Sequence, residues 1–359
     1  MIKIFGFDSL DYHFLREHLD LLPKFKELAE NGTFAPVRST DPPITPLAWG
    51  GAMTGLDLSH TPLRYTSDFI RISSTIRDEG TFFDTPSAKA SDPGPTRRAP
   101  AWKVGVANVP YTWPVWEVNG WMVSGFPTPS RRDYAFGVDA SDWPIEELWN
   151  RDAVFAGGAS DYMMLFDLER RICDMVKRFP TPDLLFLGFI SPDRVAHRYI
   201  DDEDIMLKAY VHCDDILAQF VNLKEDLVLV FSDHGAAPID ECIEYKCTHH
   251  YMAAKRAGLV GGHTMDALFM HYPRIIPPVA VPRHIREICP LIKSHLSGGI
   301  FGPDLQKVGD RGILRVGSEE NEHLSNTRST LPDDGQTEVY SQEEEELIAS
   351  KLKALGYLE

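Results

Sequence analysis

Carboxylates and imidazoles follow short apolar runs at several points of this 359-residue chain. Asp8 follows the run Ile2–Phe7, and the pair Asp233 and His234 follows the run Leu227–Phe231 after one serine. Such runs are typical of buried strands in a parallel sheet, and open α/β proteins bind ligands beyond the carboxyl ends of those strands. A carboxylate beside an imidazole suits a borderline cation such as Zn²⁺, although this pair also occurs as plain turn and cap residues.

A second carboxylate–imidazole pair follows the apolar run Asp183–Ile190. If a helix begins near Pro192, Asp193 and His197 are four residues apart and share one helix face, as two ligands of one metal would. A surface ion pair is the alternative for this spacing. His263 lies immediately before another short apolar stretch and is a further imidazole at the end of an expected strand.

Thr45 is the candidate nucleophile. Prolines on both sides of it forbid a helix before Pro46, and Pro46 itself is suited to the first turn of a helix. Thr45 would then stand just before a helix N-terminus, where amide groups and the dipole favour an anion, unless it is only an N-cap. The chain thus offers seven groups that can hold two metals and a nucleophile: Asp8, Thr45, Asp193, His197, Asp233, His234 and His263.

The motifs around these groups resemble one known family. They are Gly6-Phe7-Asp8, Pro42 to Trp49 leading to Thr54-Gly55, Val104 to Pro110, Asn119 to Gly125, Ser191 to His197, Ser232 to Gly235, and Gly262-His263, with a similar tail at Leu352 to Leu358. In this order they resemble the type I phosphodiesterase / nucleotide pyrophosphatase family of the alkaline phosphatase superfamily, over residues 1–270 with gaps. One departure is Ser59 to Leu63, where relatives commonly continue Gly-x-His-Gly-Ile after the Thr-Gly.

The resemblance implies a two-metal hydrolase of phosphodiester or nucleotide pyrophosphate bonds with a phospho-threonine intermediate at Thr45. It implies one metal held by Asp8, Thr45, Asp233 and His234, and a second held by Asp193, His197 and His263. Family members are usually zinc enzymes, although manganese also occurs. Asn108 is a candidate donor to a non-bridging substrate oxygen, with a structural turn as the alternative. Other readings are a phosphomonoesterase or phosphonate hydrolase of the same superfamily, or a metal-binding relative without catalysis.

Charge around the nucleophile favours a diester over a monoester substrate. The segment from Ser39 to Leu63 contains no Lys or Arg, and a dianionic monoester calls for a cation beyond the two metals. Arg131 or Arg132 could reverse this preference by folding over the site. A sulfatase needs Cys or Ser at the nucleophile position, and a metal-dependent phosphoglycerate mutase normally carries Ser, so Thr45 argues against both.

The elements that must position these groups predict an α/β fold: an alkaline-phosphatase-like core with a mostly parallel central sheet flanked by helices. Helical spacing is expected at Leu15–Asn31 (broken at Pro23), Ser160–Arg178, Glu203–Phe220, His284–His295 and Ser341–Leu355. In Ser160–Arg178 we expect Met164, Leu168, Ile172 and Val176 to share the apolar face. We expect one domain over residues 1–359, with insertions at 80–100, 128–158, 242–259 and 297–335.

Composition narrows the partners. The net charge of −17 argues against a nucleic-acid polymer and leaves a small phosphodiester or nucleotide as the expected substrate. The longest apolar runs are too short for a membrane span, and the N-terminus enters a strand at once, so a cytoplasmic protein is expected. Five scattered cysteines fit a reducing compartment, although Cys242, Cys247, His249 and His250 could form a small zinc site.

Overall fold

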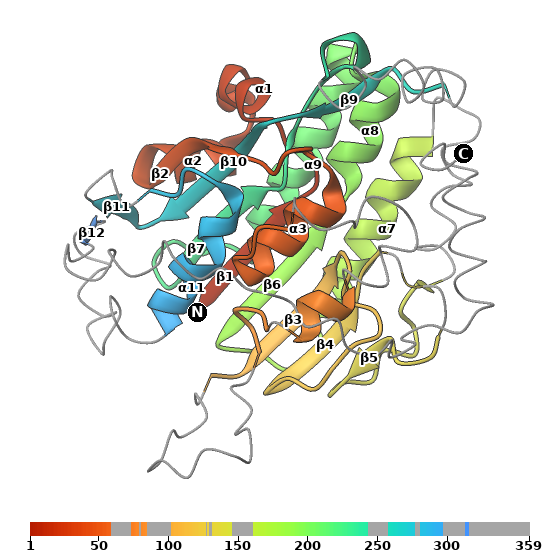
Figure 1. Cartoon of the computed structure of the whole chain (residues 1–359), viewed down its shortest axis with the longest axis vertical. Helices are drawn as coiled ribbons and strands as arrows, with labels where there is room; N and C mark the ends of the chain where they lie inside the picture. The colour runs from red at the N-terminus through yellow and green to blue at the C-terminus, as the bar shows by residue number, and fades with distance from the viewer. Residues whose placement is uncertain are drawn as a thin grey trace.

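The computed structural model describes residues 1–58, 73–78, 80–84, 102–126, 128, 131–145, 161–242, 258–276, 281–296 and 313–315. Eight strands form its central sheet: β1 (Ile2–Phe7), β2 (Thr33–Arg38), β3 (Val104–Val109), β4 (Gly120–Ser124), β5 (Ala135–Phe136), β6 (Leu184–Phe189), β7 (Leu227–Ser232) and β10 (Asp266–Tyr272). Their order is β2-β10-β7-β1-β6-β3-β4-β5 (Figure 1). The five strands from β7 to β4 run parallel, whereas β10 is antiparallel to both β7 and β2, and β5 is antiparallel to β4.

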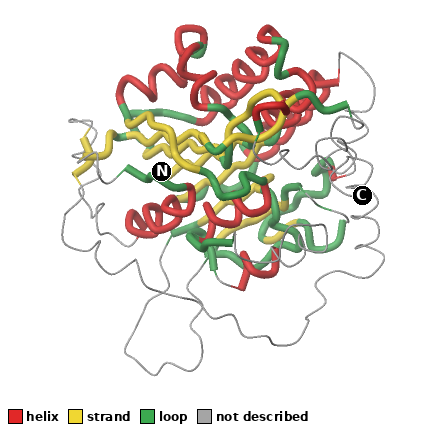
Figure 2. The backbone as a smooth tube through the Cα atoms, turned by 45° about the horizontal axis from the view of Figure 1, so that its top comes forward, coloured by secondary structure: helices red, strands yellow, loops and turns green. Residues whose placement is uncertain are grey.

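Helices cover both faces of this sheet, in two layers that lie above and below the strands in Figure 2. One face carries α1 (Tyr12–Glu17), α2 (Pro23–Asn31), α7 (Asp161–Val176), α8 (Ser191–Tyr199) and α9 (Glu203–Phe220). The other carries α3 (Thr45–Thr54), the 3₁₀ turn η5 (Ile285–Glu287) and α11 (Ile288–Leu296). The predicted α/β class, with a mostly parallel sheet flanked by helices, is therefore confirmed.

Several shorter elements lie beside the sheet and its helices. The 3₁₀ turn η1 (Leu19–Leu21) separates α1 from α2, and η2 (Ile239–Glu241) follows β8. The strands β8 (Gly235–Pro238) and β9 (Gly261–Thr264) form an antiparallel pair, and β11 (Arg274–Ile276) and β12 (Ile313–Arg315) form a parallel pair. The pair of β8 and β9 matters for function, because β9 carries His263 next to Ala236.

Side chains alternate between the two cores, as strands require. In β1, Ile4 lies in one apolar cluster, while Phe5 and Phe7 lie in the other. Gly6 faces the α3 side, and a β-carbon placed there would lie 2.3 Å from the Trp49 ring. Glycine at this position therefore allows α3 to pack directly on the centre of the sheet.

Most helix bounds follow the sequence pattern closely. α9 spans the predicted residues, and Pro23 begins the second helix of its segment as expected. The predicted apolar face of α7 is correct at Leu168, Ile172 and Val176, which are buried, but wrong at Met164, which is 60% exposed while the next residue, Leu165, is buried. One residue along a helix is a turn of about 100°, which is enough to move a side chain from the core to solvent.

Several predictions fall outside the described residues. These are most of the four insertions, the helix Ser341–Leu355, and three members of the Cys/His group (Cys247, His249 and His250). The expected helix His284–His295 begins instead as the turn η5 and continues as α11. Within the part of the chain that is described, no helix combines the length and apolar character needed to span a membrane.

Candidate active site

Three adjacent parallel strands deliver the predicted groups to one edge of the sheet. Phe7 pairs in register with Ser232 of β7 on one side and with Phe189 of β6 on the other. The residues that follow these strands therefore leave the sheet at the same level: Asp8 after β1, Asp233 after β7, and the start of α8 after β6. The carboxyl edge of the sheet is where α/β proteins place their ligands.

Four of the seven groups meet at His234. Its Nε2 lies 3.1 Å from Asp233 Oδ2, 3.4 Å from Asp8 Oδ1 and 3.3 Å from Thr45 Oγ1. One ligand atom from each of Asp8, Asp233 and His234 lies within 4.8 Å of the other two. A single divalent cation could therefore contact all three residues.

The other three groups form a second cluster beside the first. Asp193 Oδ1 lies 3.3 Å from both His197 Nε2 and His263 Nε2, and the two imidazole nitrogens are 3.2 Å apart. The rings of His263 and His234 stack with their centroids 3.9 Å apart, which joins the two clusters. The structure thus brings all seven predicted side chains together, six of them buried and Thr45 half-buried.

Backbone contacts aim these side chains at one another. His197 Nδ1 donates to the Gly261 carbonyl over 2.9 Å, and His234 Nδ1 donates to the Gly235 carbonyl over 3.2 Å. A ring that donates through Nδ1 leaves Nε2 free of its proton and available to a metal. In the same way, the Ser9 amide donates to Asp233 Oδ1 and leaves Oδ2 facing His234.

Burial and mutual repulsion perturb the carboxylates. Burial, together with Asp233 and Asp193 nearby, raises the pKa of Asp8 well above its ordinary value. Burial raises the pKa of Asp233 to about 7, although the hydrogen bond from the Ser9 amide acts to lower it. Asp193 differs: burial alone would raise its pKa, but His197 and His263 hold that pKa well below its ordinary value. Three carboxylates packed this closely favour a cation among them.

Burial favours the neutral form of two of the imidazoles, His197 and His234. Burial lowers the pKa of His197, and burial together with His263 lowers the pKa of His234 well below its ordinary value. Neutral imidazole is the form that binds metal ions. Three inward-facing oxygens are also buried without a hydrogen-bond partner among the described residues: Asp8 Oδ1, Asp193 Oδ1 and Asp233 Oδ2. Buried oxygens of this kind and neutral imidazoles fit a site for divalent cations.

Thr45 stands in the first turn of α3, where Ile44 is the N-cap residue and no side chain caps the helix. The Thr45 hydroxyl therefore does not serve as the cap that was its structural alternative; it faces His234 instead. Pro46 follows in the first turn, as predicted. The hydroxyl lies at a helix N-terminus, where an anionic group is favoured.

Asn108, Arg131 and Arg132 have hydrogen bonds or ion pairs with residues outside the seven groups. Asn108, the residue before the last of β3, has a positive φ of 57°, and its side-chain amide donates to the Gly188 carbonyl over 2.7 Å, as a structural turn would. The Arg132 side chain is 83% exposed and pairs with Asp133. Arg131 is also exposed and donates to the Ser141 carbonyl.

The sequence pattern missed one cation in the site. The buried Arg194 places Nε 3.9 Å from Asp193 Oδ2, and its guanidinium lies over the Phe126 ring at 5.2 Å. It also lowers the pKa of Asp8, so its charge reaches the first cluster. The available signal was its place between the two predicted ligands Asp193 and His197.

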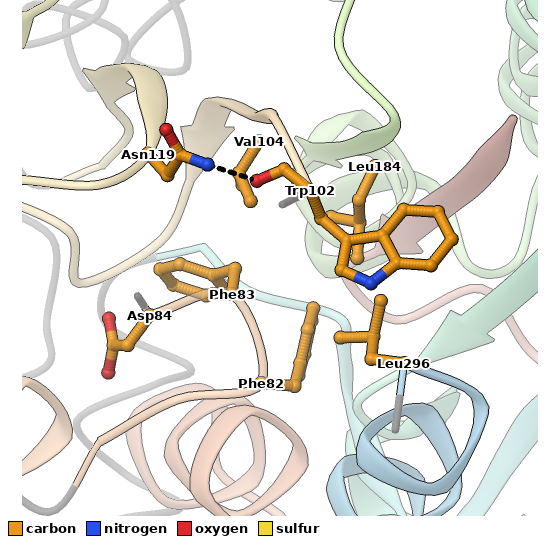
Figure 3. A pocket seen from close by; sticks show the side chains of 8 residues that line it. All are labelled: Phe82, Phe83, Asp84, Trp102, Val104, Asn119, Leu184 and Leu296. Carbon is orange, nitrogen blue, oxygen red and sulfur yellow. Dashed lines mark hydrogen bonds between the residues drawn. The ribbon is translucent and has the colours of Figure 1, made fainter. Parts of the chain in front are cut away.

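A separate pocket lies at the opposite edge of the sheet (Figure 3). Its wall includes Val104 and Leu184, the first residues of β3 and β6, together with Phe82, Phe83, Trp102 and Leu296. Its one carboxylate, Asp84, already accepts a hydrogen bond from Trp116 Nε1 over 2.7 Å. None of the seven groups lines this pocket.

The model of the type I phosphodiesterase / nucleotide pyrophosphatase family matches residues 4–344. Among solved structures, the chain is similar to phosphonoacetate hydrolase from Sinorhizobium meliloti bound to phosphonoformate, with 18% identity, a TM-score of 0.40, and coverage of 66% of this chain and 56% of that one. It is also similar to an inactive murine ectonucleotide pyrophosphatase / phosphodiesterase 5 bound to AMP, with 12% identity, a TM-score of 0.43, and coverage of 82% and 94%. No curated protein matches the sequence.

Proposed function

Because the chain belongs to the type I phosphodiesterase / nucleotide pyrophosphatase family, within the alkaline phosphatase superfamily, we propose that it hydrolyses phosphodiester or nucleotide pyrophosphate bonds with Thr45 as nucleophile. The observation that carries this proposal is the place of the Thr45 hydroxyl. It lies in the first turn of α3, 3.3 Å from His234 Nε2, in a buried cluster of carboxylates and imidazoles.

Two divalent cations would occupy the two clusters. Asp8, Thr45, Asp233 and His234 would hold one ion, and Asp193, His197 and His263 the other. When bound, two such ions lower the pKa of a hydroxyl and neutralise the charge on the attacking and leaving oxygens. The mixture of imidazole and carboxylate ligands favours Zn²⁺, with Mn²⁺ as the alternative.

Thr45 would carry the reaction in two displacements. Its Oγ attacks phosphorus and loses its proton to solvent, while the bond from phosphorus to the leaving alcohol or phosphate oxygen breaks. Water then attacks the phospho-threonine, and the Thr45–phosphorus bond breaks to regenerate the hydroxyl. Covalent catalysis of this kind divides one difficult step into two easier ones. The N-terminus of α3 favours the anionic phosphoryl group beside Thr45.

Charge balance supports a diester substrate. Among the described side chains of the site, three carboxylates and an ionised Thr45 face the Arg194 guanidinium and two dications, which leaves a single positive charge. A diester carries one negative charge on its phosphate, whereas a monoester dianion would leave the site negative. Arg132 is exposed and pairs with Asp133, and Arg131 is exposed and donates to the Ser141 carbonyl.

The test compares kcat/KM for a nitrophenyl ester of a nucleoside monophosphate with that for nitrophenyl phosphate, at the same metal concentration and pH. We expect the diester to be hydrolysed more efficiently, with about two metals per chain by elemental analysis. A higher efficiency for the monoester would replace this assignment with a phosphatase. Phosphonoacetate as a third substrate tests the phosphonate hydrolase alternative, and no turnover of any of the three would favour a non-catalytic relative.

A further inference from the structure

The start of α8 is held by a side chain from another helix. The N-cap residue of α8 is Ile190, and no side chain near it in sequence caps the helix. Instead, Glu169 of α7 accepts hydrogen bonds through Oε1 from the amides of Ile190 and Ser191, both over 3.1 Å. These are the first amides of the helix that carries Asp193 and His197.

Glu169 is itself fixed by α9. His212 Nε2 donates to Glu169 Oε2 over 2.9 Å, and the Glu169 side chain is fully buried. The Phe166 ring stacks on the His212 ring with the centroids 4.4 Å apart. Both carboxylate oxygens are thus engaged, one by α8 and one by α9. A buried carboxylate is tolerated only with such partners, so the contact fixes how three helices meet.

We propose that Glu169, held by His212, is a positioning residue for the cluster of Asp193, His197 and His263. By pinning the first turn of α8, it aims Asp193 and His197 at His263, which comes from β9 on a separate part of the chain. The helix has only nine residues, so a tilt at its start changes the direction of both side chains. This inference rests on the proposed metal-binding function of that cluster.

The experiment measures Zn²⁺ binding to metal-free protein by competition with a chromogenic chelator. We expect Glu169→Ala to lower the zinc affinity of the Asp193 cluster by 10- to 100-fold, the range for residues that support metal ligands. The zinc affinity of the other cluster should not change. Glu169→Gln keeps one acceptor oxygen for the two amides and should lose less. This conservative variant also keeps the test valid if the alanine variant fails to fold.

Asp214→Ala is the matched control. Asp214 lies on α9 and, like Glu169, accepts from the first amides of a helix, those of Lys24 and Phe25 in α2, which carries none of the seven groups. The substitution Asp214→Ala should lower the stability of the protein and leave the zinc affinities of both clusters unchanged. Unchanged affinities in Glu169→Ala and Glu169→Gln, or an equal loss in Asp214→Ala, would overturn the positioning role.

Asp193→Ala separates this inference from the proposed function. If that variant binds as much zinc as the parent, the Asp193 cluster holds no metal. The two-metal proposal then fails, and the positioning role of Glu169 fails with it. If it loses one zinc while both Glu169 variants keep parental affinity, only the positioning role fails.

Discussion

At the scale of single residues, the site is defined by where polar atoms point. Thr45 precedes Pro46 but does not cap α3, and its hydroxyl faces His234 instead. Asp233 uses one oxygen for the Ser9 amide and turns the other inward. Each inward-facing group is buried, which raises the pKa of Asp8 and lowers that of His234. The three carboxylates packed together there favour a cation among them.

The nucleophile is tested by Thr45→Ala and Thr45→Ser. Alanine removes the attacking oxygen, so kcat should fall by roughly 10³-fold or more, while serine keeps an oxygen and should retain a measurable fraction. The measurement is steady-state hydrolysis of the nitrophenyl diester, with metal content determined on the same samples. The zinc of the Asp193 cluster should survive in both variants.

Thr54→Ala is the control for the Thr45 variants, because Thr54 ends the same helix and its hydroxyl donates to the Gly50 carbonyl. Losing that hydroxyl should change stability by about 1 kcal/mol and leave kcat intact. A Thr45→Ala protein that is as active as its parent would rule out the nucleophile.

At the scale of elements, α9 organises the helical layer on its face of the sheet. The Tyr210 hydroxyl accepts from the Asp11 amide over 2.7 Å, before α1 begins. Asp214 accepts from the first amides of α2, and His212 holds the Glu169 that pins α8. Helix starts leave unsatisfied amides, and here one helix satisfies them directly or through Glu169. On the other face, the contact of Trp49 with Gly6 sets how closely α3 approaches the sheet.

Gly6→Ala tests the close packing of α3. The new β-carbon would lie 2.3 Å from the Trp49 ring, so the ring and α3 must shift. Overpacking of this kind costs about 1–3 kcal/mol of the free energy of unfolding. Because α3 also carries Thr45, diester hydrolysis should fall as well. Urea denaturation measures the first effect and steady-state kinetics the second.

Gly51→Ala is the matched substitution in the same helix, where the nearest atom to a β-carbon is the Leu56 carbonyl oxygen at 3.4 Å. Alanine is favoured over glycine within helices, so we expect unchanged or slightly higher stability and normal activity. Equal effects of the two substitutions would show that contact with Trp49 is not the cause.

At the scale of the whole molecule, the sheet separates two cores, and the core on the α3 side holds a buried histidine pair. On the α3 side, His271 of β10 and His295 of α11 place their Nε2 atoms 3.0 Å apart. Burial lowers the pKa of His271 to about 4; burial and the neighbouring His271 lower that of His295 to about 2. His271 Nδ1 donates to the Pro273 carbonyl, so His295 is the donor within a neutral pair. Protonation of either ring therefore opposes the folded state.

The pH dependence of stability follows from this pair. The folded pKa values lie below the unfolded value of about 6.5, so the contribution of each histidine is complete above pH 6.5 and is lost as pH falls toward 4. Each ring that stays neutral in the folded protein should lower the free energy of unfolding by about 1.4 kcal/mol per pH unit in that window. The measurement is urea denaturation of the metal-free protein from pH 7 to pH 5.

His295→Gln isolates the effect, because glutamine can donate to His271 Nε2 and does not titrate in this range. In this variant the free energy of unfolding should depend less steeply on pH than in the parent, by the contribution of one histidine, about 1.4 kcal/mol per pH unit. All other titrating groups are common to both proteins. If the free energies of unfolding of parent and variant differ by the same amount at every pH from 7 to 5, the histidine pair is not held neutral in the folded protein.

The sequence by itself determined the elements and which groups could do chemistry. Runs such as Leu227–Phe231 and the spacing in Glu203–Phe220 depend on neighbours within a few residues, so local patterns were enough to predict β7 and α9. The seven candidate groups stood at the ends of such elements, inside motifs of the family that matches residues 4–344. The error at Met164 is also local, since one helical position separates it from the buried Leu165.

Only the tertiary structure decided how these groups meet and what supports them. His234 lies 3.3 Å from Thr45, across 189 residues of sequence, and Glu169 reaches His212 across 43. The sequence shows that Arg194 carries a charge but not where its side chain lies. The structure places its guanidinium over the Phe126 ring and beside Asp193. Such contacts depend on the order of strands and the packing of helices, and no pattern of neighbouring residues encodes them.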